Sequence, residues 1–82
     1  MSKNKDIILP ARYGYQHKLK YLSGNLWVLE PDSKSSGMYR IIGSPDDIHA
    51  IDPDGGPFIS IDTKIEGKTV KSITINGIIE LV

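Results

Sequence analysis

The alternation of apolar and polar residues along the chain predicts short β-strands. In residues 58–65, Ile59, Ile61 and Ile65 alternate with polar residues, which places isoleucine on one face of a strand and polar groups on the other. Residues 26–29 are apolar at every position, as in a strand that is buried on both faces. Every stretch free of glycine and proline is nine residues or shorter, whereas an average helix has about 11 to 12 residues. The pattern predicts a chain that is nearly all β.

The strongest turn signal is Asn76-Gly77, which separates the strand-like residues 69–75 and 78–82. Asparagine and glycine tolerate the positive φ angles of a type I′ turn, so a two-residue hairpin is predicted here. A second hairpin is predicted around a three-residue loop at residues 23–25. The strands of this hairpin and two further short strands are expected at residues 18–22, 26–30, 38–42 and 48–51.

Five to seven short strands in 82 residues favour an all-β, single-domain barrel of the SH3-like or OB-like type. The domain is expected to span residues 1–82, with the polar residues 1–6 as a flexible tail. Trp27 lies in the most apolar strand and is predicted to anchor the core. The apolar C-terminal strand either completes its own sheet or offers an edge to another copy of the chain.

Composition supports this interpretation and excludes several classes of protein. There are 13 isoleucines and 3 valines against 2 alanines, and β-branched residues pack well on pleated sheets. No cysteine is present, so a thiolate nucleophile, a disulfide and a cysteine-bound zinc are excluded. The net charge is zero, unlike that of a basic nucleic-acid coat protein. The first apolar run ends at Pro10, which predicts a cytoplasmic protein without a membrane partner.

Charge is nevertheless divided along the chain, because residues 1–25 carry a local charge of +4 and residues 26–66 a local charge of −5. The positive part contains a basic aromatic segment. Aromatic rings stack on bases while cations neutralise phosphates, so this segment could bind a nucleotide or single-stranded nucleic acid. The alternative is that the tyrosines cover the barrel rim and the cations extend into water. The residues concerned are Arg12, Tyr13, Tyr15, His17, Lys18, Lys20 and Tyr21.

Residues 52–57 form a second candidate site, either a binding loop or a tight turn. They contain two prolines and two glycines, which predict a loop. Its candidate residues are Asp52, Asp54, Gly55 and Gly56. With Asp46, Asp47 and His49 just before it, the loop superficially looks like a calcium site, but Pro53 breaks the ligand spacing that an EF-hand needs. We therefore expect turn-forming aspartates, no metal and no cofactor.

The sequence contains no recognisable catalytic set. His17 and His49 could each act as a general base, but no partner residue is evident for either one. No Gly-x-Ser-x-Gly elbow, Walker motif or dinucleotide glycine pattern is present. We therefore expect a protein that is not an enzyme.

Residues 52–73, which read DPDGGPFISIDTKIEGKTVKSI, resemble small β-rich proteins of gut bacteria and their phages. The resemblance rests on a Gly-Gly-Pro turn that leads into a strand and a charged hairpin. It implies a phage or mobile-element origin, in a host cell cytoplasm, and transfers no catalytic residue. The first functional hypothesis is a non-catalytic accessory protein, oligomeric or bound to a protein partner, that sequesters or blocks a host component. The alternatives are a barrel that binds nucleic acid or a nucleotide, and a structural component of a virion.

Overall fold

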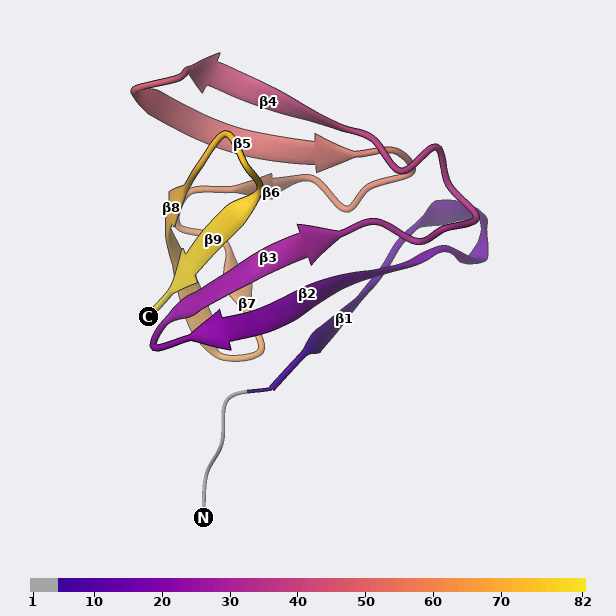
Figure 1. Ribbon diagram of the computed structural model, residues 1–82, viewed down its shortest axis with the longest axis horizontal. Coiled ribbons are helices and arrows are strands. Elements are labelled where there is room, and N and C mark those ends of the chain that lie inside the picture. Colours follow the sequence, from indigo (N-terminus) through magenta and orange to yellow (C-terminus); the bar gives the residue numbers. More distant parts are fainter. Residues whose placement is uncertain (1–4) are drawn as a thin grey trace.

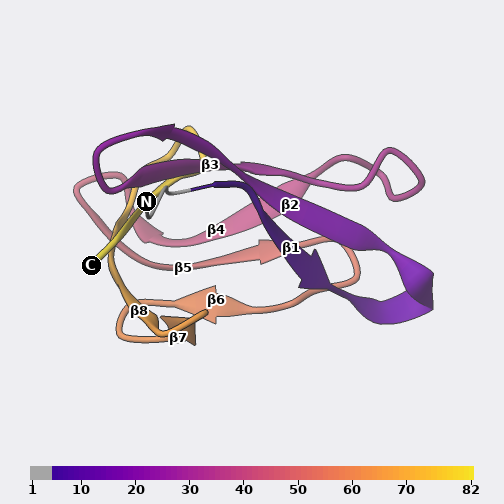
Figure 2. The ribbon, with the colours of Figure 1, turned by 90° about the horizontal axis from the view of Figure 1, so that it is seen from below.

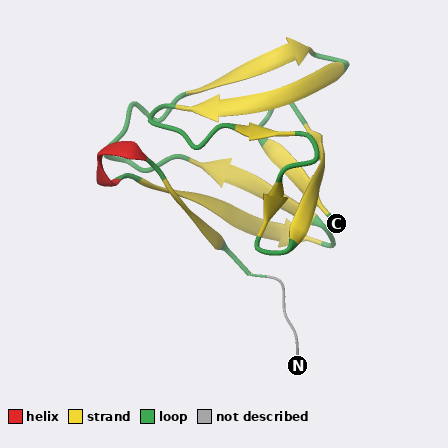
Figure 3. Ribbon diagram, turned by 180° about the vertical axis from the view of Figure 1, so that it is seen from behind, coloured by secondary structure: helices red, strands yellow, loops and turns green. Residues whose placement is uncertain are grey.

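The computed structural model describes residues 5–82, which form nine short β-strands, one 3-10 turn and no α-helix (Figure 3). Every strand pair is antiparallel. The all-β prediction is therefore confirmed. The strands are β1 (Ile7–Pro10), β2 (Gln16–Ser23), β3 (Leu26–Glu30), β4 (Tyr39–Ser44), β5 (Asp47–Pro53), β6 (Ile59–Ser60), β7 (Lys64–Ile65), β8 (Lys68–Ile73) and β9 (Ile78–Leu81), and the 3-10 turn η1 is Arg12–Gly14.

The strands are arranged in two sheets. Six of them form a curled half-barrel in the order β1-β2-β3-β9-β8-β7, and the other three form a sheet in the order β4-β5-β6. The β4–β5 hairpin lies across the top of Figure 1, above the curled sheet. In Figure 2, β2 and β3 run along one side of the molecule and β6 and β7 along the other, with β1 between them. The half-barrel therefore stays open along β1 and β7, its two edge strands.

The core lies between the curled sheet and the three-stranded sheet. Alternate residues of β1, β3 and β9 point into it, as the repeating buried and exposed pattern of β1 illustrates. Trp27 is 1% exposed, which confirms it as a core anchor, and Leu19, Ile51 and Ile79 are fully buried around the same cluster. Burial of such side chains contributes about 1.5–3 kcal/mol each, and it is the main source of stability in a chain without disulfides.

The C-terminal strand completes the protein's own sheet. β9 pairs with β3 on one side and with β8 on the other, so neither of its edges is free. The hairpin between β8 and β9 is confirmed, but its predicted type I′ turn is wrong. Gly77 has a φ of 82° while Asn76 stays at negative φ, and the N–H of Thr74 donates to the carbonyl of Ile78. Three residues therefore form the loop, with glycine alone in the left-handed position.

Residues 58–65 do not form the single strand that their alternation predicts. A turn divides them into β6 and β7, which belong to different sheets. Asp62 has a φ of 74°, and the Thr63 hydroxyl accepts a hydrogen bond from the N–H of Ser60 at 3.2 Å. This local side-chain bond competes with strand pairing, and it is invisible to a count of apolar periodicity. It is one reason why residues 5–82 form nine strands rather than the predicted five to seven.

Two further predictions about loops need correction. The loop between β2 and β3 has two residues rather than three, because Ser23 pairs with Leu26 and the ladder shifts register between Tyr21 and Ser23. β5 continues through Pro53, so the loop predicted at residues 52–57 begins at Asp54. Pro53 is the last residue of β5 and lies beyond the two residues that pair with β6.

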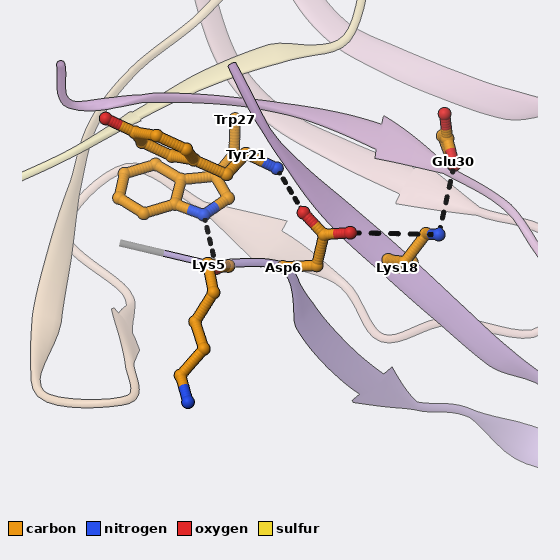
Figure 4. A network of polar contacts seen from close by, with 6 residues as sticks. All are labelled: Lys5, Asp6, Lys18, Tyr21, Trp27 and Glu30. Carbon is orange, nitrogen blue, oxygen red and sulfur yellow. Dashed lines mark hydrogen bonds and ion pairs between the residues drawn. The ribbon is translucent and has the colours of Figure 1, made fainter. Parts of the chain in front are cut away.

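The last two residues of the N-terminal tail predicted at residues 1–6 form hydrogen bonds with the sheet. The indole Nε1–H of Trp27 donates to the carbonyl of Lys5 at 3.0 Å, and the N–H of Tyr21 donates to Oδ1 of Asp6 at 2.8 Å (Figure 4). Residues 5 and 6 are therefore fixed against β2 and β3. The rest of the predicted tail, residues 1–4, lies outside the described residues. No helix within residues 5–82 is long and apolar enough to cross a membrane.

Candidate functional site

The structure brings one end of the basic aromatic segment against the glycine loop that follows β5. The backbone N–H of Arg12 donates to the carbonyl of Gly55 at 2.9 Å. Gly55 has a φ of 83°, and a Cβ atom at this position would lie 2.8 Å from Cδ2 of Tyr15. Only glycine fits here without displacing the ring. The basic aromatic segment and the glycine loop thus form one surface, although Tyr15 and Gly55 are 40 residues apart in the sequence.

His17 holds this surface together from inside the protein. Its side chain is fully buried. Nδ1 accepts the N–H of Asp32 at 2.8 Å, and Nε2 lies 2.8 Å from the carbonyl of Asp54. A carbonyl can only accept, so Nε2 carries the proton and the ring is held as one neutral tautomer. Both nitrogens are occupied by main-chain partners, which makes His17 a positioning residue rather than a base or a ligand.

A surface hollow of about 460 Å³ opens where the loop meets η1, a volume within the usual range for ligand pockets. Phe58 forms part of its wall and is 57% exposed. Asp52 lies on the same wall, with its Oδ2 3.5 Å from Nη2 of Arg40. No carboxylate within residues 5–82 forms an ion pair with Arg12. The lining residues are Pro10, Ala11, Arg12, Asp52, Gly55, Gly56, Pro57 and Phe58.

A second hollow, of about 320 Å³, continues from the first along β1. The two hollows share Pro10, Pro57 and Phe58 as lining residues, so they are neighbours, and together we call them the β1 groove. Ile8 on its rim is 50% exposed. The far end is lined by residues 63–66, which include β7. The groove therefore occupies the opening of the half-barrel, between its two edge strands.

The remaining residues of the basic aromatic segment lie elsewhere. Nζ of Lys18 is 3.9 Å from Asp6 and 3.7 Å from Glu30, on the outer face of the sheet. Tyr21 packs edge-on against Trp27, with ring centroids 5.1 Å apart, at the far end of β2 (Figure 4). Lys20 is exposed on the same strand as Lys18. Lys18 pairs with Ile8 across the ladder, whereas Tyr21 lies near the other end of β2 from Arg12, so the segment forms no single binding surface.

Arg12, Tyr13 and Tyr15 stay together beside the groove. Tyr13 is 79% exposed, and its φ of 63° is unusual for a residue other than glycine. Its ring meets the ring of Tyr15 edge-on, with centroids 5.7 Å apart. This leaves one cation and one exposed aromatic ring available at this end of β2.

The acidic residues around β5 are used locally. Oδ2 of Asp54 accepts the N–H of Ser36 at 3.0 Å, and Oδ2 of Asp47 lies 3.7 Å from Nε2 of His49. Within the part of the chain that the structure describes, no three such side chains gather as a set of metal ligands. Asp54 therefore ties the loop after β5 to the segment before β4.

The carboxylate of Asp32 is stabilised by backbone N–H groups from two segments of the chain. The backbone N–H groups of Lys34 and Gln16 donate to its carboxylate, each at 2.8 Å. These bonds favour the ionised form and hold the pKa of Asp32 below its usual value. The carboxylate of Asp32 thus fixes Gln16, while the backbone N–H of Asp32 fixes His17.

Several residues of the groove were not singled out in the sequence. Ile8, Pro10, Pro57 and Phe58 come from two segments, and their meeting depends on strand order. The one local signal was Phe58, a large apolar residue directly after a Gly-Gly-Pro turn. Comparisons of the chain with protein-family models, curated proteins and solved structures found no match.

Proposed function

We propose that this protein is a non-catalytic binding protein, encoded by a phage or mobile element, that sequesters or blocks a protein of its host. The observation that carries the proposal is the β1 groove, which is lined mainly by apolar residues and is open at the surface. Exposed apolar surface next to an unpaired strand edge is typical of protein-binding sites. The resemblance of residues 52–73 to proteins of gut bacteria and their phages supports the proposed origin.

The geometry favours a groove that exists before the partner binds. Its loop wall is fixed by the buried ring of His17 and by the Arg12–Gly55 hydrogen bond. Its strand wall is fixed by the pairing of β1 with β2 along four residue pairs. A rigid site loses little conformational entropy on association, which favours affinity.

Single-stranded nucleic acid or a nucleotide is the second candidate ligand. It is supported by the grouping of Arg12, Tyr13 and Tyr15 next to the 460 Å³ hollow. One cation and one exposed ring form a small platform compared with the basic grooves that follow a nucleic-acid backbone. The protein partner is therefore the better-supported ligand.

The test is affinity capture from lysates of gut bacteria, comparing the wild-type protein with two variants. Phe58→Glu places a charge in the groove, while Ile75→Glu alters a residue of equal exposure, 56% against 57%, in the distant β8–β9 loop. We expect one host protein to be retained by the wild type and by Ile75→Glu, and lost with Phe58→Glu. The purified host protein should then show the same order of affinities in calorimetry. Capture that is identical for all three proteins would refute the proposal.

A further inference from the structure

The free edge of β1 exposes main-chain groups that have no partner strand. Pro10 has no N–H and stands opposite Gln16, whose own N–H turns away from β1 to Asp32. The Pro10–Gln16 pair therefore exchanges no ladder bonds. Because bonded and non-bonded pairs alternate in an antiparallel ladder, Leu9 bonds to β2, and the N–H and C=O of Ile8 point outward.

No strand of the described chain pairs with this edge. β1 bonds only to β2, and the two residues of β7 end the same sheet on the opposite side of the groove. The space between them is the 320 Å³ hollow. An unpaired edge beside a preformed groove is the arrangement that accepts an added strand, through main-chain bonds and a pocket for alternate side chains.

The side chains around the edge indicate what such a strand would contain. Ile8 and Phe58 are 50% and 57% exposed, so an apolar side chain next to them would cover surface that now meets water. At the Pro10 end, Asp52 is engaged with Arg40, whereas Arg12 has no ion-pair partner among residues 5–82. This end of the groove is complementary to a carboxylate.

We propose that β1 accepts an extended segment of a partner protein as an added edge strand, with an apolar side chain between Ile8 and Phe58 and an acidic side chain at Arg12. This inference rests on the proposed function and names the chemistry of its partner. Ile8 and Pro10 are two residues apart in β1, about 7 Å, and Arg12 lines the first hollow together with Pro10. The acidic side chain is therefore expected two to three positions away from the apolar one.

The probe is a phage-displayed library of random octapeptides, selected on the full-length protein. The selected peptides should share an apolar residue two to three positions from an aspartate or glutamate. Synthetic copies are then tested against Ile8→Pro, which removes the outward N–H at an edge position where proline is tolerated, and against Ile8→Ala, which shortens the side chain but keeps the N–H and should weaken binding less. We expect Ile8→Pro to weaken binding about ten-fold, the effect of losing one good hydrogen bond. Arg12→Gln should weaken binding about as much, and only for peptides that carry the acidic residue.

Control variants distinguish strand addition at β1 from the broader proposal that the β1 groove binds a host protein. Ile75→Glu should bind the peptides like the wild type, and amide spectra should show that each variant is folded. Unchanged binding by Ile8→Pro, together with loss in Phe58→Glu, would overturn strand addition while the groove remains a protein-binding site. A dimer that Ile8→Pro dissociates would assign the edge to a second copy and overturn the proposed partner. Selection of no peptide, or binding of an oligonucleotide that Arg12→Gln abolishes, would also overturn it.

Discussion

The two ends of β2 are each fixed by a buried ring, but the rings hold different parts of the chain. At the first end, both nitrogens of His17 bond to main-chain groups, one of Asp32 and the other of Asp54. At the other end, Tyr21 packs against Trp27, whose indole makes one bond, to the carbonyl of Lys5. The first ring fixes the loop after β5, and the second fixes the segment that enters β1.

The comparison shows how a small chain can build a rigid groove. The loop after β5 and the strand β1 are the two walls of the β1 groove, and each is held from one end of the same strand. On the outer face, Lys18 makes only long ion pairs with Asp6 and Glu30, and the three side chains are 38–45% exposed. Such exposed pairs add little to the free energy of unfolding. Stability at both ends therefore depends on buried hydrogen bonds and packing rather than on charge.

The largest expected effect is at His17. The variant His17→Ala removes a fully buried ring and leaves the N–H of Asp32 and the C=O of Asp54 without their side-chain partner, and we expect the free energy of unfolding to fall by about 3–5 kcal/mol. His17→Asn keeps an acceptor near Nδ1 and should lose about half as much. Urea denaturation measures both. The control is Lys18→Ala on the outer face, where about 0–1 kcal/mol is expected. A loss at His17 no larger than at Lys18 would contradict the role of the ring.

At the other end of the strand, Trp27→Phe removes the bond to Lys5 and part of a large buried ring. We expect a loss of about 2–3 kcal/mol. Hydrogen exchange should quicken at Ile7 and Leu9 in β1 and stay unchanged in the loop after β5. Tyr21→Phe is the control, because its hydroxyl bonds only to the exposed carbonyl of Gly24. Equal acceleration in both walls of the groove would show that the two ends are not independent.

Two glycine substitutions allow the contact between Gly55 and Tyr15, at the His17 end of β2, to be measured separately from backbone strain. Gly55 and Gly67 have φ angles of 83° and 81°, but a Cβ atom at Gly67 would meet nothing within 4 Å. Gly67→Ala should therefore cost about 1–2 kcal/mol, from the left-handed backbone alone. Gly55→Ala should cost about 1 kcal/mol more, because the Tyr15 ring must move. Equal losses would mean that the contact between Tyr15 and Gly55 contributes nothing.

The same comparison explains what could be predicted from the sequence. Glycine and proline spacing and the excess of isoleucine identified the all-β class, and the apolar strand around Trp27 identified the core. The prediction of a single strand at residues 58–65 was wrong because the hydroxyl of Thr63 accepts a hydrogen bond across a turn, which periodicity cannot detect.

The candidate site was predicted only in part, for a related reason. The basic aromatic segment and the glycine loop each contribute residues to the groove, but their contact depends on which strands pair. His17 was grouped with the ligand-binding residues because it lies within the basic aromatic segment. Its two partners lie 15 and 37 residues away. Strand order determines whether such a side chain is exposed or buried, and no local pattern carries that information.

The smallest expected effect is the pH dependence contributed by Asp32. Because backbone N–H groups hold its pKa in the folded protein below the usual value of about 3.9, folding favours the ionised carboxylate. Its stabilising contribution is complete above that value and is lost as the pH falls through the lower, folded-state pKa. Asp32→Asn removes this contribution. Denaturation of both proteins at several pH values should show a stability difference that is constant near neutrality and shrinks in acid. All other carboxyl groups titrate in both proteins, so a difference independent of pH would show that Asp32 does not supply the acid sensitivity of the His17 end.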